Sequence, residues 1–135
     1  MTIGYSSPER IKGKYDFKTD IWSLGVILYE MVTLEPMFKG NNSNKMYNIV
    51  HYKYDKSPLM KMNAVFREII KNTVVVDPKK RWETQEILKC IKKYEEQLKY
   101  KQQTISPDQS KIDILTDDQT TRTLRIHNFQ HTDPI

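Results

Sequence analysis

Residues 20–34 read DIWSLGVILYEMVTL, a stretch whose apolar side chains surround nearly the whole circumference of a helix. At about 100° per residue, the apolar and aromatic positions leave no gap wider than about 80° on a helical wheel. Because each face of such a helix needs shielding from water, the stretch predicts a central buried helix with neighbours on every side. Thr19 or Asp20 is predicted to cap its start, and Pro36 closes the region after it.

Three further stretches predict helices around this one. A Gly-Asn-Asn-Ser turn at residues 40–43 precedes an apolar cluster, Met46, Tyr47, Ile49 and Val50, that predicts a short helix before Ser57-Pro58. Residues 62–76 have helical spacing and stop at Asp77-Pro78, because a residue before proline avoids the helical region. Residues 83–103 form a long amphipathic pattern. The sequence contains no convincing set of strands, so the predicted fold is mainly α.

The composition predicts one modest domain followed by a tail. The chain has 135 residues and 38% apolar content, which supports one small core. We expect this domain to occupy residues 1–100. Residues 101–135 are polar and hold too few apolar side chains to offset the entropy of ordering, so they predict a disordered tail.

The charge and hydropathy of the sequence indicate which partners and which cellular location to expect. The net charge of +5 comes from scattered basic residues without an aromatic-interleaved stripe, which predicts no nucleic-acid partner. No apolar run reaches membrane-spanning length, and the N-terminus lacks the apolar core of a leader. We therefore expect no membrane association and an intracellular location, cytoplasmic or nuclear. The single cysteine, Cys90, cannot form an intrachain disulfide.

Three motifs follow one another along the chain. The first, TIGYSSPE at residues 2–9, fits a Thr-x-x-Tyr-x-Ala-Pro-Glu element with Ser7 in place of Ala. The second is Asp-x-Trp-Ser-x-Gly at residues 20–25, and the third is Asp-Pro-x-x-Arg at residues 77–81. Together they resemble the C-terminal lobe of a eukaryotic serine/threonine protein kinase, from the end of the activation segment to the last helix.

The resemblance covers residues 2–98 and implies the truncated C-terminal, or large, lobe of a protein-kinase-like fold. The segment LYEMVTLEPMFKGNN at residues 28–42 is most similar to the NIMA-related kinases. Calcium/calmodulin-dependent kinases and the stress-responsive translation-factor kinases stay open as alternatives.

The resemblance implies structural roles for four residues. Glu9 is implied to form an ion pair with Arg81, 72 positions away, and so to pin the substrate-binding loop to the lobe. Asp20 is implied to accept hydrogen bonds from the backbone of the catalytic loop, and it also fits a simple N-cap carboxylate. Trp22 is implied to lie buried near the Ser-Pro-Glu turn.

The resemblance also implies a substrate-binding segment at Thr2, Ile3, Gly4 and Tyr5. The Thr2 hydroxyl is implied to meet the catalytic Asp and to help position a serine or threonine hydroxyl. The three residues after it are implied to line the pocket for the next substrate residue. Tyrosine kinases tend to have Pro and Trp at the positions of Thr2 and Tyr5, so the pattern favours serine or threonine as the acceptor. The implied partners are a protein substrate or a partner kinase.

Phosphoryl transfer in this family needs parts that the sequence does not contain. A complete member uses ATP and magnesium, held by a Gly-rich loop, a strand Lys paired with a helix Glu, an His-Arg-Asp loop and an Asp-Phe-Gly metal ligand. We therefore expect no catalytic residue, metal site or cofactor in this chain, and no phosphoryl transfer by it alone. Three interpretations stay open: the downstream part of a full kinase, a non-catalytic docking module that binds through residues 40–60 and an exposed core flank, and a non-functional relic.

Overall fold

A computed structural model describes residues 2–104, and every regular element in this range is a helix. The mainly α prediction is therefore confirmed for the described residues, whereas most of the predicted tail, residues 105–135, lies outside them. The chain divides into two units, Met1–Glu95 and Glu96–Ile135, and the described part of the second unit is the end of the last helix. The elements are η1 (Ile3–Tyr5), α1 (Pro8–Ile11), α2 (Phe17–Thr33), α3 (Asn42–Val50), α4 (Ser57–Lys61), α5 (Ala64–Thr73), η2 (Pro78–Lys80) and α6 (Thr84–Thr104).

Three of these helices lie where hydrophobic spacing predicts them, with different ends. α3 begins at Asn42, ahead of the apolar cluster that predicts it, because the Asn41 side chain caps it by accepting the Asn44 N–H at 2.9 Å. α5 is shorter than predicted at both ends. α6 continues to Thr104, so residues 101–104 are helical, and α4 has no counterpart among the predicted helices.

The central helix, α2, starts earlier than the sequence predicts. It begins at Phe17 with Asp16 as its N-cap, so the prediction of a cap at Thr19 or Asp20 is wrong. Thr19 instead lies in the first turn, where its hydroxyl accepts the Asp16 N–H at 3.4 Å. At the other end, Leu34 adopts a left-handed conformation (φ 59°) and its N–H donates to the Glu30 carbonyl, which closes the helix before Pro36.

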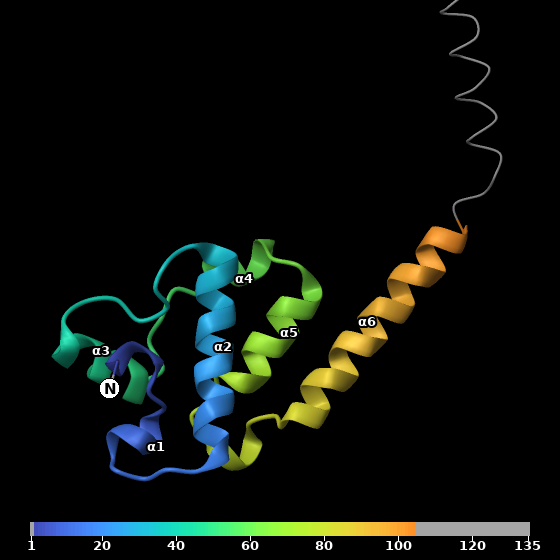
Figure 1. Ribbon diagram of the computed structural model, residues 1–135. Helices are drawn as coiled ribbons and strands as arrows, with labels where there is room; N and C mark the ends of the chain where they lie inside the picture. The colour runs from blue at the N-terminus through green and yellow to red at the C-terminus, as the bar shows by residue number, and fades with distance from the viewer. Residues whose placement is uncertain (1, 105–135) are drawn as a thin grey trace, which may run out of the picture. The chain divides into compact units, whose positions relative to one another are not determined.

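Figure 1 shows α2 at the centre of the first unit, with α5 beside it on one side and η1, α1 and α3 on the other. On the inner faces of α2, Trp22, Val26 and Tyr29 are buried in the main core. The Trp22 ring stacks on Phe38 with 6.0 Å between ring centroids. The central position predicted for this helix is thus the observed one.

One face of α2, which we call the exposed α2 face, is not covered by any element in residues 2–104. Its side chains are 43–87% exposed, so the helix lacks neighbours on this side and has the exposed core flank that the docking-module interpretation expects. The helical wheel shows that the face needs shielding, but it does not show which element supplies the shield. The exposed α2 face consists of Phe17, Leu24, Ile27, Met31 and Leu34.

No described helix combines the length and the hydropathy needed to cross a membrane.

Gly25 allows α2 to pack closely against the end of α5. A Cβ atom at this position would lie 2.7 Å from Val74 Cγ2 and would overlap the Thr73 side chain. Thr73 and Val74 are both fully buried, so neither side chain can move aside into solvent. The glycine is therefore required by the helix packing and not by its own backbone conformation.

We expect Gly25→Ala to destabilise the chain by roughly 1–3 kcal/mol despite the higher helix propensity of alanine, because the added methyl overpacks the core. Urea denaturation of the full chain measures this loss. Gly4→Ala is the matched control, since no heavy atom lies within 4 Å of a Cβ atom at that position. Equal stability of the wild type and Gly25→Ala would contradict the packing argument.

Candidate functional site

The segment from Thr2 to Ser6 is held against α2 by two hydrogen bonds. The Tyr5 hydroxyl donates to Glu30 Oε2 at 2.8 Å, and the Ser23 hydroxyl donates to the Tyr5 carbonyl at 2.8 Å. The hydrogen bond to the Glu30 carboxylate also raises the pKa of Tyr5. The backbone and side chain of Tyr5 are thus both fixed by α2.

A polar pocket of about 320 Å³ lies between this segment and the start of α2. It brings together three residues that the sequence predicts from two separate motifs, Thr2, Tyr5 and Asp20. Ile3 instead packs against the core and Gly4 is buried, so these two predicted substrate-binding residues do not line the pocket. The lining residues are Thr2, Tyr5, Ser6, Arg10, Tyr15, Thr19, Asp20 and Ser23.

Asp20 is exposed at the rim of this pocket, in the first turn of α2. Its Oδ2 atom accepts a hydrogen bond from the Tyr15 hydroxyl at 3.1 Å, and this bond raises the pKa of Tyr15. The Arg10 guanidinium lies 5.0 Å from the Tyr15 ring centroid. The catalytic-loop backbone that Asp20 is predicted to hold is not part of this sequence, so that role stays a prediction.

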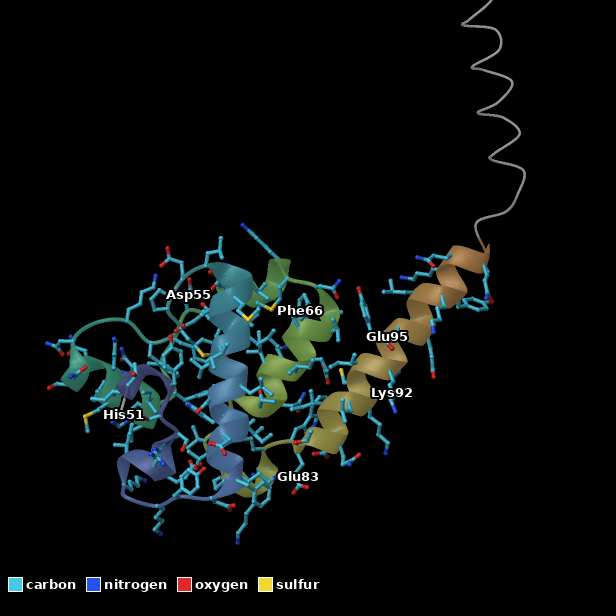
Figure 2. All side chains as sticks on the ribbon, in the orientation of Figure 1. His51, Asp55, Phe66, Glu83, Lys92 and Glu95 are labelled. Carbon is cyan, nitrogen blue, oxygen red and sulfur yellow. The ribbon has the colours of Figure 1, made fainter. Side chains whose placement is uncertain are left out.

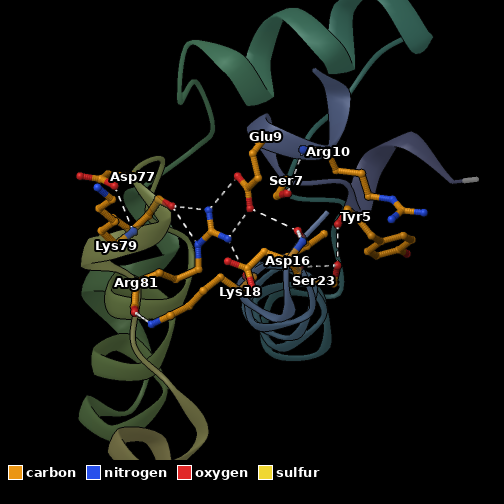
Figure 3. A network of polar contacts seen from close by, with 12 residues as sticks. Tyr5, Ser7, Glu9, Arg10, Asp16, Lys18, Ser23, Asp77, Lys79 and Arg81 are labelled. Carbon is orange, nitrogen blue, oxygen red and sulfur yellow. Dashed lines mark hydrogen bonds and ion pairs between the residues drawn. The ribbon is translucent and has the colours of Figure 1, made fainter. Parts of the chain in front are cut away.

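The guanidinium of Arg81 lies at the centre of the polar network in Figure 3. Two parallel hydrogen bonds join it to Glu9, from Nη1 to Oε1 at 2.7 Å and from Nη2 to Oε2 at 3.1 Å. Nε and Nη2 also donate to the Val75 carbonyl at 3.0 and 2.8 Å, and Nη1 donates to the Lys18 carbonyl. Arg81 is only 1% exposed, yet each of its five guanidinium N–H groups has an acceptor.

The charge on Glu9 is stabilised within this network. Burial opposes ionisation of the carboxyl, but hydrogen bonds from Arg81, from the Glu9 backbone and from Ser7 outweigh it, and the pKa of Glu9 is lowered. The side chain of Glu9 is 13% exposed and that of Arg81 is fully buried. The two residues predicted to pair thus form a bidentate contact that is largely removed from water.

Lys18 and Trp22 complete the surroundings of Arg81. The Lys18 ammonium donates to the Arg81 carbonyl and pairs with Glu83 Oε1 at 3.1 Å, so Lys18 and Arg81 exchange backbone contacts. The Trp22 ring lies 5.2 Å from the guanidinium carbon. Lys18 lies outside the three motifs, and the sequence signal for it is its position one helical turn before Trp22, because such residues share a helix face.

The described residues contain no group of three or more His, Cys, Asp and Glu side chains that could hold a metal ion. The candidate site is therefore a polar binding pocket supported by an ion pair, without metal ligands in residues 2–104.

Comparison with known proteins gives this site a context. Residues 1–91 match the protein kinase domain family. A probable cell division protein kinase of Encephalitozoon cuniculi is 46% identical over 55 residues, covering 39% of this chain and 21% of that protein. The probable serine/threonine-protein kinase nek2 of Dictyostelium discoideum is 35% identical over 86 residues, covering 62% of this chain and 20% of that protein. The chain thus spans about a fifth of the length of these relatives.

Among solved structures, the twitchin kinase region from C. elegans has a similar fold. The TM-score is 0.60 at 25% sequence identity, and the match covers 65% of this chain and 16% of that one. The two sequence relatives carry different kinase names at comparable similarity, so the comparisons do not single out the NIMA-related subfamily.

A double-mutant cycle tests the ion pair. We expect Glu9→Gln to cost about 3–5 kcal/mol because it strands the buried Arg81 charge. Arg81→Met should cost more than Glu9→Gln, since it also removes the bonds to Lys18 and Val75. The double variant should lose less than the sum of the single variants, measured by urea denaturation, and strictly additive losses would argue against the pair. Glu35 and Lys39, paired at 2.8 Å but exposed, are the control cycle and should give a much smaller coupling.

The lowered pKa of Glu9 predicts a pH dependence of stability. Because the folded pKa lies below the ordinary value of 4.5, the carboxylate contributes stability above that value and loses it as pH falls through the folded pKa. We expect the stability difference between the wild type and Glu9→Gln to be full near neutral pH and to shrink in acid. Urea denaturation across this range checks it; a difference independent of pH would contradict the assignment.

Proposed function

The chain belongs to the protein kinase domain family, and on this premise we propose that it supplies the substrate-binding side of the C-terminal lobe of a serine/threonine protein kinase. Protein kinases act on protein substrates. In this proposal the whole protein transfers phosphate from ATP to a serine or threonine hydroxyl, and the segment from Thr2 to Tyr5 receives the acceptor part of the substrate.

The observation that carries the proposal is the polar pocket shared by Thr2, Tyr5 and Asp20. Thr2 is exposed at the pocket, so its hydroxyl is accessible to a bound serine or threonine. The Tyr5 ring and carbonyl are fixed by Glu30 and Ser23, which keeps the pocket wall in place when a peptide binds. A pocket with hydroxyl and carboxylate groups suits an acceptor segment that offers a hydroxyl and backbone amides.

The hydrogen bonds of Arg81 help to hold the segment that forms the polar pocket. α1 carries Glu9 and follows the Thr2–Tyr5 segment in the chain, so the Glu9 to Arg81 contact holds the far end of that segment in place. We propose that this contact is a positioning element and that Asp20 orients the catalytic loop supplied by the rest of a kinase domain. In this arrangement none of the described residues performs the proton or phosphoryl transfer.

ATP and magnesium are the cofactors of the kinase family, and the described residues do not fit them. No metal-binding group of acidic or histidine side chains is present in residues 2–104. Gly13 and Gly40 lie in isolated turns and Gly25 lies inside a helix, so these glycines do not form a phosphate-binding loop. We propose that the nucleotide site is contributed from outside this chain.

A second candidate function, a non-catalytic docking module, rests on the exposed α2 face. Its apolar side chains recur at residues 17, 24, 27, 31 and 34, with spacings of a coiled-coil seam. An exposed apolar stripe of this kind marks a surface that binds another protein element. In this alternative the stripe receives a partner kinase or another protein, and the Thr2–Tyr5 segment does not bind substrate.

Peptide titration of the isotopically labelled full chain distinguishes the two candidates by NMR. A peptide with a central serine should shift the amide signals of Thr2, Tyr5 and Ser23 more than the same peptide with alanine. Tyr5→Phe removes the hydroxyl that binds Glu30 and should weaken this binding several-fold. Tyr100→Phe is the control, because Tyr100 is exposed in α6. Shifts confined to Leu24, Ile27 and Met31 would instead favour the docking module.

Titration with ATP and magnesium is the second arm of the same experiment. We expect no saturable shifts, because the described residues offer neither metal ligands nor a phosphate-binding loop. Saturable shifts would overturn the proposal that the nucleotide site lies outside this chain.

A further inference from the structure

One stretch of the chain combines several lysines with few acidic residues. Residues 39–61 contain five lysines, one aspartate and no glutamate, which gives this stretch a net charge of +4 against +5 for the whole chain. The stretch forms α3, the loop after it and α4. Figure 2 labels His51 at the end of α3 and Asp55 in the loop. We call this stretch with its side chains the basic surface.

Two of its lysines are held on aromatic rings at the surface. The Lys53 ammonium lies 4.8 Å from the Tyr47 ring centroid and donates to the Tyr47 hydroxyl at 3.2 Å. The Lys56 ammonium lies 4.6 Å from the Tyr52 centroid and 5.4 Å from the Tyr54 centroid. These contacts restrict flexible side chains without neutralising them, so two positive charges are kept in place for a ligand.

The remaining charges show which lysines are available to an anion. Lys39 forms an ion pair with Glu35 at 2.8 Å. In the part of the chain that the structure describes, no carboxylate forms an ion pair with the other four lysines of the stretch. The Asp55 carboxylate accepts the Ser57 N–H at 2.9 Å, and this hydrogen bond lowers the pKa of Asp55. Lys45, Lys53, Lys56 and Lys61 are therefore charged groups without an acidic partner in residues 2–104.

A groove of about 380 Å³ adjoins these charges. Its apolar lining comes from Tyr29, Val32 and Met62, and its charged lining comes from Lys39 and Lys61 together with Glu35 and Asp55. The Tyr29 hydroxyl donates to the Asp55 carbonyl at 2.8 Å, which connects the groove to the loop that carries Lys56. The groove has the size and the lining to accept an aliphatic side chain with a charged flank.

We propose that the basic surface and this groove form a docking site for an acidic segment of a partner protein. An aliphatic side chain of the segment enters the groove, and carboxylates on either side of it bind Lys56 and Lys61, with Lys53 beyond them. Charge complementarity identifies the occupant, because the stretch is strongly positive and its available lysines lack acidic partners. The site is separate from the Thr2–Tyr5 pocket and goes beyond the function proposed above.

The arrangement favours a peptide over a nucleic acid. Binding of single-stranded nucleic acid relies on open aromatic faces on which bases stack. Here one face of the Tyr47, Tyr52 and Tyr54 rings is already occupied by a lysine. The exposed Asp55 carboxylate also repels a continuous phosphate backbone more than it repels separated carboxylates.

Fluorescence anisotropy with the full chain tests the docking site. The probe is a labelled peptide with one leucine flanked by glutamates and without serine or threonine, so its binding does not require the Thr2–Tyr5 pocket. We expect saturable binding that weakens with added salt, and a loss of roughly tenfold or more in affinity for Lys56→Glu combined with Lys61→Glu. Lys12→Glu combined with Lys14→Glu is the matched control, because both lysines are exposed outside the basic surface and the change in net charge is the same.

Each other result overturns the proposal. An equal loss in both double variants would mean attraction to net charge alone, and unchanged binding after replacing the glutamates by glutamines would exclude the carboxylate contacts. Unchanged binding after replacing the leucine by glycine would remove the groove from the site. Tighter binding of a single-stranded oligonucleotide or of phosphatidylserine vesicles, at the same salt, would assign the surface to those ligands. Circular dichroism confirms that the exchanged surface residues leave the fold intact.

Discussion

The fold of this chain depends on the solvation of one cation, the guanidinium of Arg81. Its burial is sustained because five N–H groups meet five acceptor contacts from three parts of the chain: Glu9 in α1, the Lys18 carbonyl at the start of α2, and the Val75 carbonyl after α5. A buried cation that lost any of these partners would carry an uncompensated desolvation cost. Arg81 therefore fixes the relative positions of these three segments, and its guanidinium also lies over the Trp22 ring.

A second carboxylate, that of Glu30 farther along α2, also joins separate parts of the chain by hydrogen bonds. Its Oε2 atom accepts the Tyr5 hydroxyl at 2.8 Å, and its Oε1 atom accepts the Met37 N–H at 3.1 Å. One side chain thus joins the polar pocket to the segment that leads into the basic surface. The two proposed binding regions are separate in position, but they share this anchor on the central helix.

The sequence predicted which segments form helices better than it predicted where each helix begins and ends. Helical spacing located α2, α3, α5 and α6, and the protein-kinase-like lobe predicted from three motifs is confirmed. Spacing alone could not pair Glu9 with Arg81 across 72 positions; the motif resemblance did. The start of α2 was misplaced because Asp16, Thr19 and Asp20 all have capping side chains, and only the backbone shows which one occupies the N-cap. Lys53 and Lys56 looked like scattered surface charges, since their contacts with tyrosine rings depend on how the loop folds back on α3.

The sequence separation of Glu9 and Arg81 also has a kinetic consequence. The contact closes a loop of 72 residues, and the entropy of that closure must be lost before the contact can return any stability. α2 and α5 lie within this loop, so their packing shortens the effective distance that remains to be closed. Until then both charges stay hydrated, because neither can enter the interior without the other. We therefore expect the burial of the ion pair to be a late event in folding, and the polar pocket at Thr2 and Tyr5 to become rigid only when that event is complete.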